Sequence, residues 1–220
     1  EHLTVNQVVV SSSLTAGVII KESPAACWRL FLYTMTGELW FVFSWKGEKI
    51  KMRALLVIDM QNGVCRTKGQ TLFRLKDLVT LVNCRIRWFR EQGLQIIFIQ
   101  HQNMNLTRGT IAWQLLSELY VREEDLYVNK TQLNAFYQTD LQSLLIQRQG
   151  DELEICGAQT EYCVDTTIKM AHGLGYRLEM VPGASSTVDN KFLTVRQTIQ
   201  YFEEIWGQNF LKFISKIKTK

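Results

Sequence analysis

Short apolar runs alternate with longer segments of helical period from Met52 onward. The apolar runs are rich in Ile, Val and Leu, as buried strands are, and lie at 54–58, 94–100, 126–128, 152–156 and 177–181. The segments between them repeat apolar residues with the period of a helix and predict helices at 72–91, 110–119, 138–149, 160–172 and 191–206. Strands that alternate with helices predict βαβ units, and therefore an α/β fold with a parallel sheet covered on both faces.

The first 51 residues do not follow this pattern. The stretch from Lys46 to Met52 can be encoded by a purine-rich ribosome-binding element, an A-rich spacer and a start codon, so one hypothesis is that Met52 is the biological start and 1–51 is upstream sequence read in frame. The alternative is a divergent N-terminal extension with a β-hairpin around Gly37. The predicted organisation is therefore an N-terminal segment at 1–51, one α/β domain at 52–210 and a basic tail at 211–220.

The composition of the chain argues against nucleic-acid-binding, membrane-spanning and disulfide-rich proteins. The chain has 220 residues, of which 46% are apolar and 21% charged, as in a globular domain with a substantial core. The net charge of +4 comes largely from lysines near the C-terminus, so no nucleic-acid partner is expected, and no apolar run is long enough to span a bilayer. The five cysteines show no C-x-x-C spacing, which disfavours a zinc site and a disulfide framework and favours a reducing cytoplasm.

Cys163 is the first candidate for chemistry. It follows a predicted strand and begins a predicted helix, where unpaired N–H groups and the helix dipole favour the thiolate. Asp59 and Lys130 also lie at the ends of apolar runs, and the carboxyl ends of parallel strands meet at one edge of a sheet. Taken singly, each has a plain structural alternative: a core cysteine, a turn-capping aspartate and a solvated lysine. Their joint occurrence at strand ends favours a site.

Three segments in this order resemble one family. They are LLVIDMQN at 55–62, KTQLNAFYQTDL at 130–141 and GAQTEYCVDTT at 157–167. They are similar to motifs of the isochorismatase-like cysteine hydrolases, which include nicotinamidases, carbamoylsarcosine and ureidoacrylate amidohydrolases and streptothricin hydrolase. The resemblance covers about 52–206 and implies a three-layer α/β/α fold with a mostly parallel sheet of about six strands.

The resemblance also implies roles. Cys163 would attack a carbonyl carbon and form an acyl-enzyme, Asp59 would accept the thiol proton, and Lys130 would stabilise the negative charge. The backbone N–H groups of Gln159 and Cys163 would form the oxyanion hole, with a cis peptide bond between Ala158 and Gln159 turning the first of them toward the site.

The histidines His2, His101 and His172 bear on metal binding. Metal-dependent nicotinamidases place an aspartate and several histidines after the second strand, whereas the segment 99–105 reads IQHQNMN, with one imidazole and no nearby carboxylate. No metal and no cofactor are therefore expected. A cysteine–histidine dyad that uses His101 or His172 is the mechanistic rival. His172 lies far along the same predicted helix as Cys163 and faces away from its start, and His101 is interpreted as a structural or pocket-lining residue. The substrate pocket is expected to involve Gln61, His101, Trp113, Phe136 and Tyr162.

The predicted function is a metal-independent cysteine hydrolase that cleaves a C–N bond of a small amide, ureide or lactam through a covalent acyl-enzyme. Isochorismatases proper lack the cysteine and cleave a vinyl ether, so Cys163 favours C–N hydrolysis. The alternative is a catalytically silent member that binds a small molecule or partner through the same pocket. The resemblance also implies a homo-oligomer, with the aromatic stretch at 201–206 as a candidate interface. The substrate is set by pocket side chains, whose shape a single sequence does not reveal.

Overall fold

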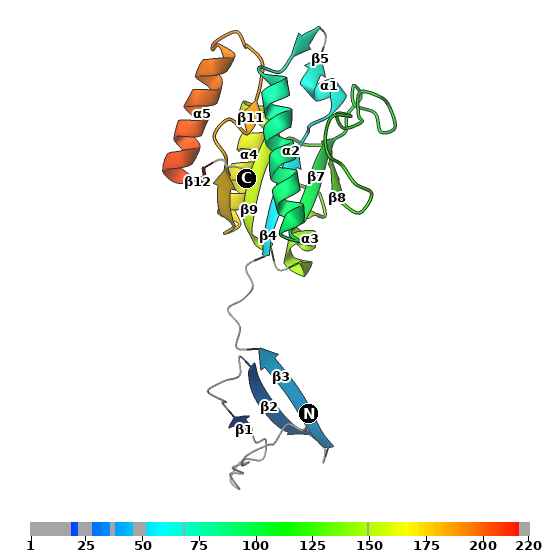
Figure 1. Cartoon of the computed structure of the whole chain (residues 1–220), viewed down its shortest axis with the longest axis vertical. Coiled ribbons are helices and arrows are strands. Elements are labelled where there is room, and N and C mark those ends of the chain that lie inside the picture. The colour runs from blue at the N-terminus through cyan, green and yellow to red at the C-terminus, as the bar shows by residue number, and fades with distance from the viewer. Residues whose placement is uncertain are drawn as a thin grey trace. The chain divides into compact units, whose positions relative to one another are not determined.

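The computed structural model describes residues 52–67, 69–148 and 150–215, together with the backbone of three strands before residue 46. The chain divides into two compact units, Glu1–Ile50 and Lys51–Lys220 (Figure 1). Within the described residues, no helix is both long and apolar enough to cross a membrane.

The first unit contains a small antiparallel sheet of β1 (Ile19–Lys21), β2 (Trp28–Met35) and β3 (Glu38–Trp45), in that order. Strands β2 and β3 pair from Trp28 opposite Trp45 to Met35 opposite Glu38. This is the hairpin that the extension hypothesis predicts around position 37. A biological start at Met52 stays a hypothesis.

The second unit is built on one parallel sheet. The strands are β4 (Met52–Ile58), β7 (Gln95–His101), β8 (Leu126–Lys130), β9 (Gly150–Ala158), β10 (Arg177–Met180), β11 (Ser185–Ser186) and β12 (Lys212–Phe213). Their order is β12-β10-β9-β4-β7-β8, with β11 beside β9, and every pairing is parallel. The predicted parallel α/β sheet is therefore confirmed. Strand β12 lies in the segment predicted as a basic tail, and it pairs with β10.

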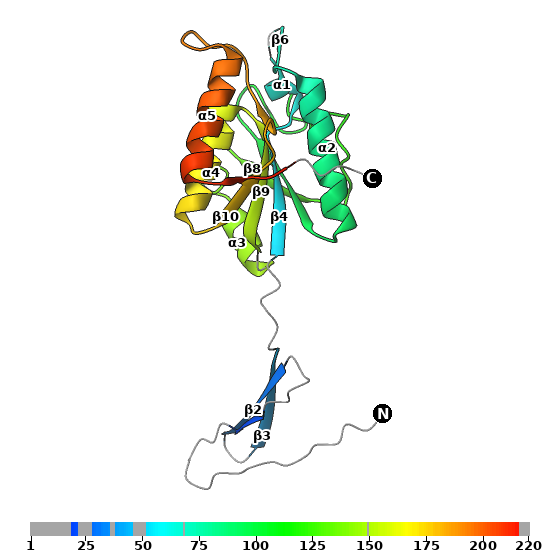
Figure 2. The ribbon, with the colours of Figure 1, turned by 60° about the vertical axis from the view of Figure 1, so that its left-hand side comes forward.

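The helices α1 (Asn62–Cys65), α2 (Leu75–Glu91), α3 (Leu141–Gln147), α4 (Asp165–Gly173) and α5 (Val195–Asn209) join these strands, with a π-helical turn η1 (Thr160–Val164) before α4. Helix α2 covers one face of the sheet, and α3, α4 and α5 lie on the other (Figure 2). A short ribbon of β5 (Arg66–Thr67) and β6 (Gln70–Thr71) follows α1. Helix α5 begins four residues later than predicted because Thr194 and Gln197 form a reciprocal capping box.

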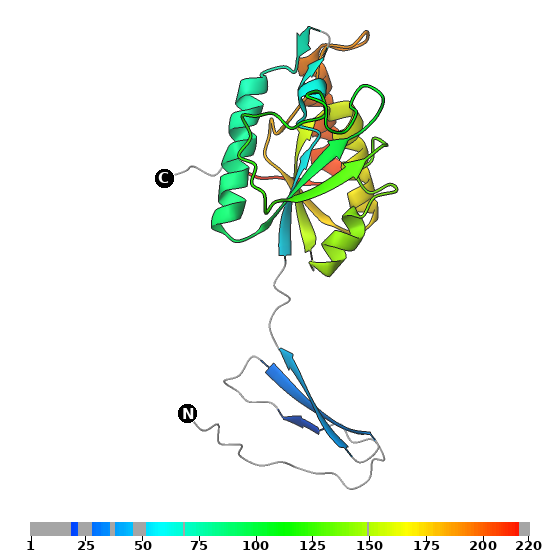
Figure 3. The ribbon, with the colours of Figure 1, turned by 90° about the vertical axis from the view of Figure 1, so that its right-hand side faces the viewer.

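The central strands are buried on both faces, which explains their uninterrupted apolar sequence. Residues 55–58 of β4 have no exposed surface, and Phe98 and Ile99 of β7 are equally buried. Each such side chain contributes roughly 1.5–3 kcal/mol when it leaves water. The sheet is therefore a rigid base for the residues at its carboxyl end, where the loops after β7 and β8 also lie (Figure 3).

The helix predicted at 110–119 is wrong. The segment forms turns, because several of its carbonyl groups accept hydrogen bonds from the chain after β4 and are not free to continue a helix. The N–H groups of Asn62 and Gly63 donate to Gln114 and Ala112 at 2.9 and 2.8 Å. The Gln61 amide donates to the Trp113 carbonyl at 2.7 Å. A continuous helix would use these carbonyl groups internally and deny them to the donors after β4, so tertiary hydrogen bonds outweigh the local period.

A buried ion network ties α2 to the sheet. Arg85 donates from Nε and Nη2 to the two oxygens of Glu154 at 2.5 and 2.8 Å, and Arg53 donates to Glu154 at 2.8 Å. The Arg85 and Glu154 side chains are only 3% and 1% exposed. Removal of one partner would leave a charge without compensation in a medium that solvates it poorly.

We expect Glu154→Ala to lower the free energy of unfolding by about 3–5 kcal/mol, because two guanidinium groups lose their shared carboxylate. Urea titration followed by circular dichroism measures the change. The exposed Glu123→Ala is the matched control and should change stability by less than about 0.5 kcal/mol. Equal effects of the two substitutions would contradict this role of Glu154.

Candidate active site

Three chain segments place Asp59, Lys130 and Cys163 at the carboxyl end of the sheet. Asp59 follows β4, Lys130 ends β8, and Cys163 lies in the turn η1 that follows β9. Asp59 has a φ of 49°, in the left-handed region, and its N–H donates to the Ile99 carbonyl at 2.9 Å. Aspartate tolerates this conformation better than most residues, so the chain can turn sharply at the strand end.

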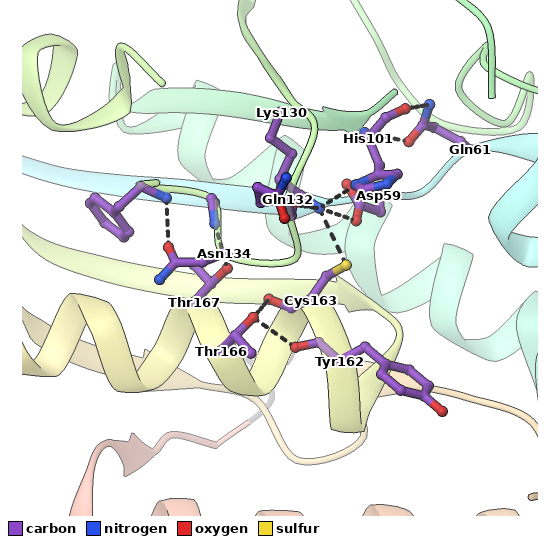
Figure 4. Close-up of polar contacts among 12 residues, drawn as sticks. Asp59, Gln61, His101, Lys130, Gln132, Asn134, Tyr162, Cys163, Thr166 and Thr167 are labelled. Carbon is purple, nitrogen blue, oxygen red and sulfur yellow. Dashed lines mark hydrogen bonds and ion pairs between the residues drawn. The ribbon is translucent and has the colours of Figure 1, made fainter. Parts of the chain in front are cut away.

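The ammonium group of Lys130 joins the other two side chains (Figure 4). Its Nζ lies 2.7 Å from Asp59 Oδ2 and 3.2 Å from Cys163 Sγ. It also lies 3.2 Å from the Gln132 carbonyl oxygen and 3.2 Å from His101 Nδ1. Asp59 and Lys130 are each 1% exposed and Cys163 is 8% exposed. The three side chains therefore lie together, as their positions at the ends of strands predict.

The surroundings of Cys163 act against the thiolate form that its helix-start position favours. Burial, and after it the Asp59 carboxylate, raise the pKa of the Cys163 thiol to about 12, while Lys130 acts in the opposite direction. In the free protein, burial and the neighbouring negative charge therefore favour the neutral thiol and oppose the effect of the helix start.

The two carboxylate oxygens of Asp59 have different surroundings. Its Oδ2 accepts from Lys130, whereas its Oδ1 is buried without a hydrogen-bond partner among the described residues. A carboxylate oxygen of Asp59 and Cys163 Sγ lie within 4.8 Å of each other. A buried acceptor without a donor is costly, and a thiol proton would satisfy it.

A cavity of about 320 Å³ opens above the thiol. Its lining residues are Asp59, Gly63, Val64, Gln70, His101, Asn103, Leu106, Leu133, Gln159, Tyr162, Cys163 and Val188. The peptide bond between Ala158 and Gln159 is cis. Gln159 and Cys163, whose N–H groups are the proposed oxyanion donors, both line this cavity. Its volume suits a small molecule of a few heavy atoms beyond the reacting group.

Comparison with known proteins identifies the family. The sequence matches the family described as the Isochorismatase domain over residues 53–205. The chain belongs to the isochorismatase family. This isochorismatase-family chain is 48% identical to the protein in a crystal structure described as an isochorismatase family protein. The match covers 74% of this chain and 98% of that chain, with a TM-score of 0.72.

Curated relatives of this family member differ in what their names say. A protein of Arabidopsis thaliana named "Probable inactive nicotinamidase" is 31% identical over 152 residues, which are 59% of this chain and 78% of the relative. A ureidoacrylate amidohydrolase of Agrobacterium fabrum is 22% identical over 192 residues, which are 70% of this chain and 84% of the relative. The family is therefore shown together with its hydrolase fold, and the reaction has to be argued from the site.

The five residues expected at the pocket have different positions. His101 and Tyr162 line the cavity, whereas Gln61, Trp113 and Phe136 are not among its lining residues. Gln61 has no exposed surface and binds the main chain of His101 on both sides, accepting from its N–H at 2.7 Å and donating to its carbonyl at 3.0 Å. Phe136 packs against the ring of Tyr176. The amide of Gln61 therefore holds the main chain of His101 in place and does not itself line the cavity.

Sequence reasoning missed several lining residues. Asn103 and Leu133 follow β7 and β8 by two and three positions, so proximity to a strand end was a usable signal. Gln70 and Val188 come from the β6 ribbon and the segment after β11, and no local pattern marks them. Their place depends on how the loops pack.

His101 is nearer to a carboxylate than the sequence suggested. Within the described part of the chain, a ring nitrogen of His101, an oxygen of Asp59 and Cys163 Sγ lie within 4.8 Å of one another and form a possible metal-ligand set. The segment 99–105 itself contains no carboxylate, and Asp59 reaches the imidazole from another strand. All three groups also contact Lys130 Nζ, so a metal ion at their centre would have to displace the ammonium group.

Proposed function

We propose that this isochorismatase-family protein is a metal-independent cysteine hydrolase that cleaves a C–N bond of a small amide, ureide or lactam. The observation that carries the proposal is the buried ammonium of Lys130, which contacts both Asp59 and Cys163 at the base of a cavity. A nucleophile, a base and a cation within hydrogen-bonding distance are the components of covalent catalysis.

The proposed reaction begins with the neutral thiol. Burial, and after it the Asp59 carboxylate, raise the pKa of the Cys163 thiol, so the thiol is neutral before it attacks. Transfer of the proton to Asp59 Oδ1 while Sγ attacks the carbonyl carbon avoids a free thiolate. Lys130 then stabilises the negative charge that moves from Asp59 toward the substrate.

The tetrahedral intermediate collapses with proton transfer in the reverse direction. Its oxyanion accepts hydrogen bonds from the N–H groups of Gln159 and Cys163, and Asp59 returns the proton to the leaving nitrogen as the C–N bond breaks. The remaining thioester is attacked by water, which gives its proton to Asp59. The acid leaves, and Cys163 recovers its proton from Asp59.

A panel of small amides, ureides and lactams tests this proposal. We expect release of ammonia or amine from at least one compound, and mass spectrometry of the quenched reaction should find an acyl group on Cys163. Binding of several compounds without turnover or acylation would reject the hydrolase and favour a catalytically silent binding protein. A homo-oligomer stays a prediction, which light scattering would test.

Chelation tests the metal-independent part. After exhaustive dialysis against a chelator, we expect an unchanged rate on any substrate that the panel identifies, because Lys130 supplies the positive charge at the base of the site. Loss of the rate and recovery with one particular divalent ion would contradict this expectation. Cys163→Ala, treated in the same way, measures the background.

The pH dependence of alkylation tests the charge arrangement. Asp59 raises the pKa of the Cys163 thiol, so Asp59→Asn should shift iodoacetamide labelling of Cys163 to lower pH. Lys130 lowers that pKa, so Lys130→Met should shift labelling to higher pH. Peptide mass spectrometry separates Cys163 from the other cysteines, and superimposable profiles for the wild type and both variants would reject the arrangement.

A further inference from the structure

The segment between β8 and α3 forms part of the site without regular secondary structure. Residues 131–140 form bends and turns, so their backbone groups are not paired with one another as they would be in a helix or a strand. The segment still supplies two parts of the site. The Gln132 carbonyl oxygen lies 3.2 Å from Lys130 Nζ, and Leu133 lines the cavity.

One hydrogen bond joins this segment to a distant part of the chain. The N–H of Ala135 donates to Oγ1 of Thr167 at 3.1 Å (Figure 4). Neither residue has any exposed surface. Among the described residues, the other hydrogen bonds of the segment stay within 130–144. Thr167 is therefore its polar anchor to the rest of the domain.

Thr167 lies about one helical turn after the nucleophile. Helix α4 begins two residues after Cys163, and Thr167 is its third residue. A threonine inside a helix often turns its hydroxyl to a carbonyl of the preceding turn, and the neighbouring Thr166 does so, donating to the Tyr162 carbonyl at 2.8 Å. Thr167 instead offers its oxygen to another segment. It thereby links the chain after β8 to the helix that follows Cys163.

The buried N–H of Ala135 depends on this oxygen. A buried donor that loses its acceptor also has no water to bind, so the segment would have to move to satisfy it. Phe136 packs against the ring of Tyr176 and anchors the part of the segment that follows Ala135. Gln132 and Leu133 lie on the other side of Ala135 and would move with its N–H.

We propose that Thr167 is a positioning residue, whose hydroxyl oxygen holds Gln132 and Leu133 in place. The Gln132 carbonyl thereby stays beside the Lys130 ammonium, and Leu133 stays in the wall of the cavity that contains Cys163. The effect on catalysis rests on the proposed function. The effect on access to the Cys163 thiol can be measured without a substrate.

Amide hydrogen exchange, followed by nuclear magnetic resonance of the full chain, tests the anchor. In the wild type we expect the Ala135 N–H to exchange at least about tenfold more slowly than those of Leu133 and Asn134, which have no acceptor among the described residues. Thr167→Val keeps the shape of the side chain and loses the acceptor, so Ala135 should exchange at least about tenfold faster. Thr167→Ser should keep most of the protection. A wild-type Ala135 that exchanges as fast as Leu133 and Asn134 overturns the proposal.

Alkylation of Cys163 by iodoacetamide measures the effect on the site. We expect labelling to be about 3–10-fold faster in Thr167→Val, the equivalent of one hydrogen bond, because a loosened wall admits the reagent. Thr167→Ser should label at close to the wild-type rate. Thr166→Val is the matched control, because its hydroxyl bonds carbonyl groups of its own helical turn. Cys156, buried in β9, reports global unfolding and should stay unlabelled.

The outcomes separate this role from general destabilisation. Equal labelling of Cys163 in the wild type and Thr167→Val overturns the proposal, as does equal acceleration in Thr166→Val or joint acceleration of Cys156. On a substrate from the amide panel, Thr167→Val should raise KM about 3–10-fold and change kcat less. A lower kcat with an unchanged KM contradicts a role in the wall. Failure to find any cleaved amide counts against the hydrolase alone, because exchange and labelling need no turnover.

Discussion

Cys163→Ala and Cys163→Ser are expected to abolish hydrolysis while leaving the fold intact. The alanine variant has no nucleophile, and the serine hydroxyl is much harder to ionise beside a carboxylate that already opposes negative charge. Turnover on a substrate found in the amide panel should fall by at least about 10⁴-fold, as for other enzymes that lose a covalent nucleophile. Steady-state release of ammonia or amine measures the loss.

Two controls make this result specific. Cys156→Ser changes a buried strand cysteine outside the cavity lining, so it should leave the rate within about tenfold even where it lowers stability. Circular dichroism and urea unfolding of Cys163→Ala should match the wild type to within about 1–2 kcal/mol, since the lost volume is small. A Cys163 variant that keeps near-wild-type turnover would exclude the covalent mechanism.

Gly157→Ala is expected to have the largest effect on folding. Gly157 has a φ of 129°, and a Cβ at this position would lie 2.0 Å from the Ile58 carbonyl oxygen and 2.7 Å from the Ile58 nitrogen. Both atoms belong to the backbone of the neighbouring central strand, next to Asp59, so no side chain can move aside. We expect a loss of more than about 4 kcal/mol in the free energy of unfolding, or failure to fold.

Gly175→Ala separates the clash from the conformational cost. Gly175 also has a positive φ, of 87°, but a Cβ there has open space around it. It should therefore lose only about 1–2 kcal/mol, the cost of the left-handed region for a residue with a side chain. Urea titrations of both variants give the comparison. Similar losses would mean that the approach of β9 to β4 tolerates a side chain at Gly157.

Local patterns in the sequence determined most of the framework. The runs at 54–58, 94–100, 126–128, 152–156 and 177–181 all became strands, because a strand buried on both faces must be apolar throughout. Parallel strands run in the same direction and end at the same edge of the sheet, so the positions of Asp59, Lys130 and Cys163 at strand ends were enough to predict that they lie together. Their roles in catalysis await the experiments above.

Only the tertiary structure decided the pKa of the Cys163 thiol and the conformations of the loops around the cavity. The pKa of the Cys163 thiol depends on how deeply it is buried and on the Asp59 carboxylate from another strand, and neither is visible in the helix-start pattern. The buried Gln61 amide binds the main chain of His101. The segment at 110–119 forms turns, and its carbonyl groups accept hydrogen bonds from the chain after β4. These outcomes depend on contacts between residues far apart in the chain, and such contacts outweigh local preferences of a few tenths of a kcal/mol per residue.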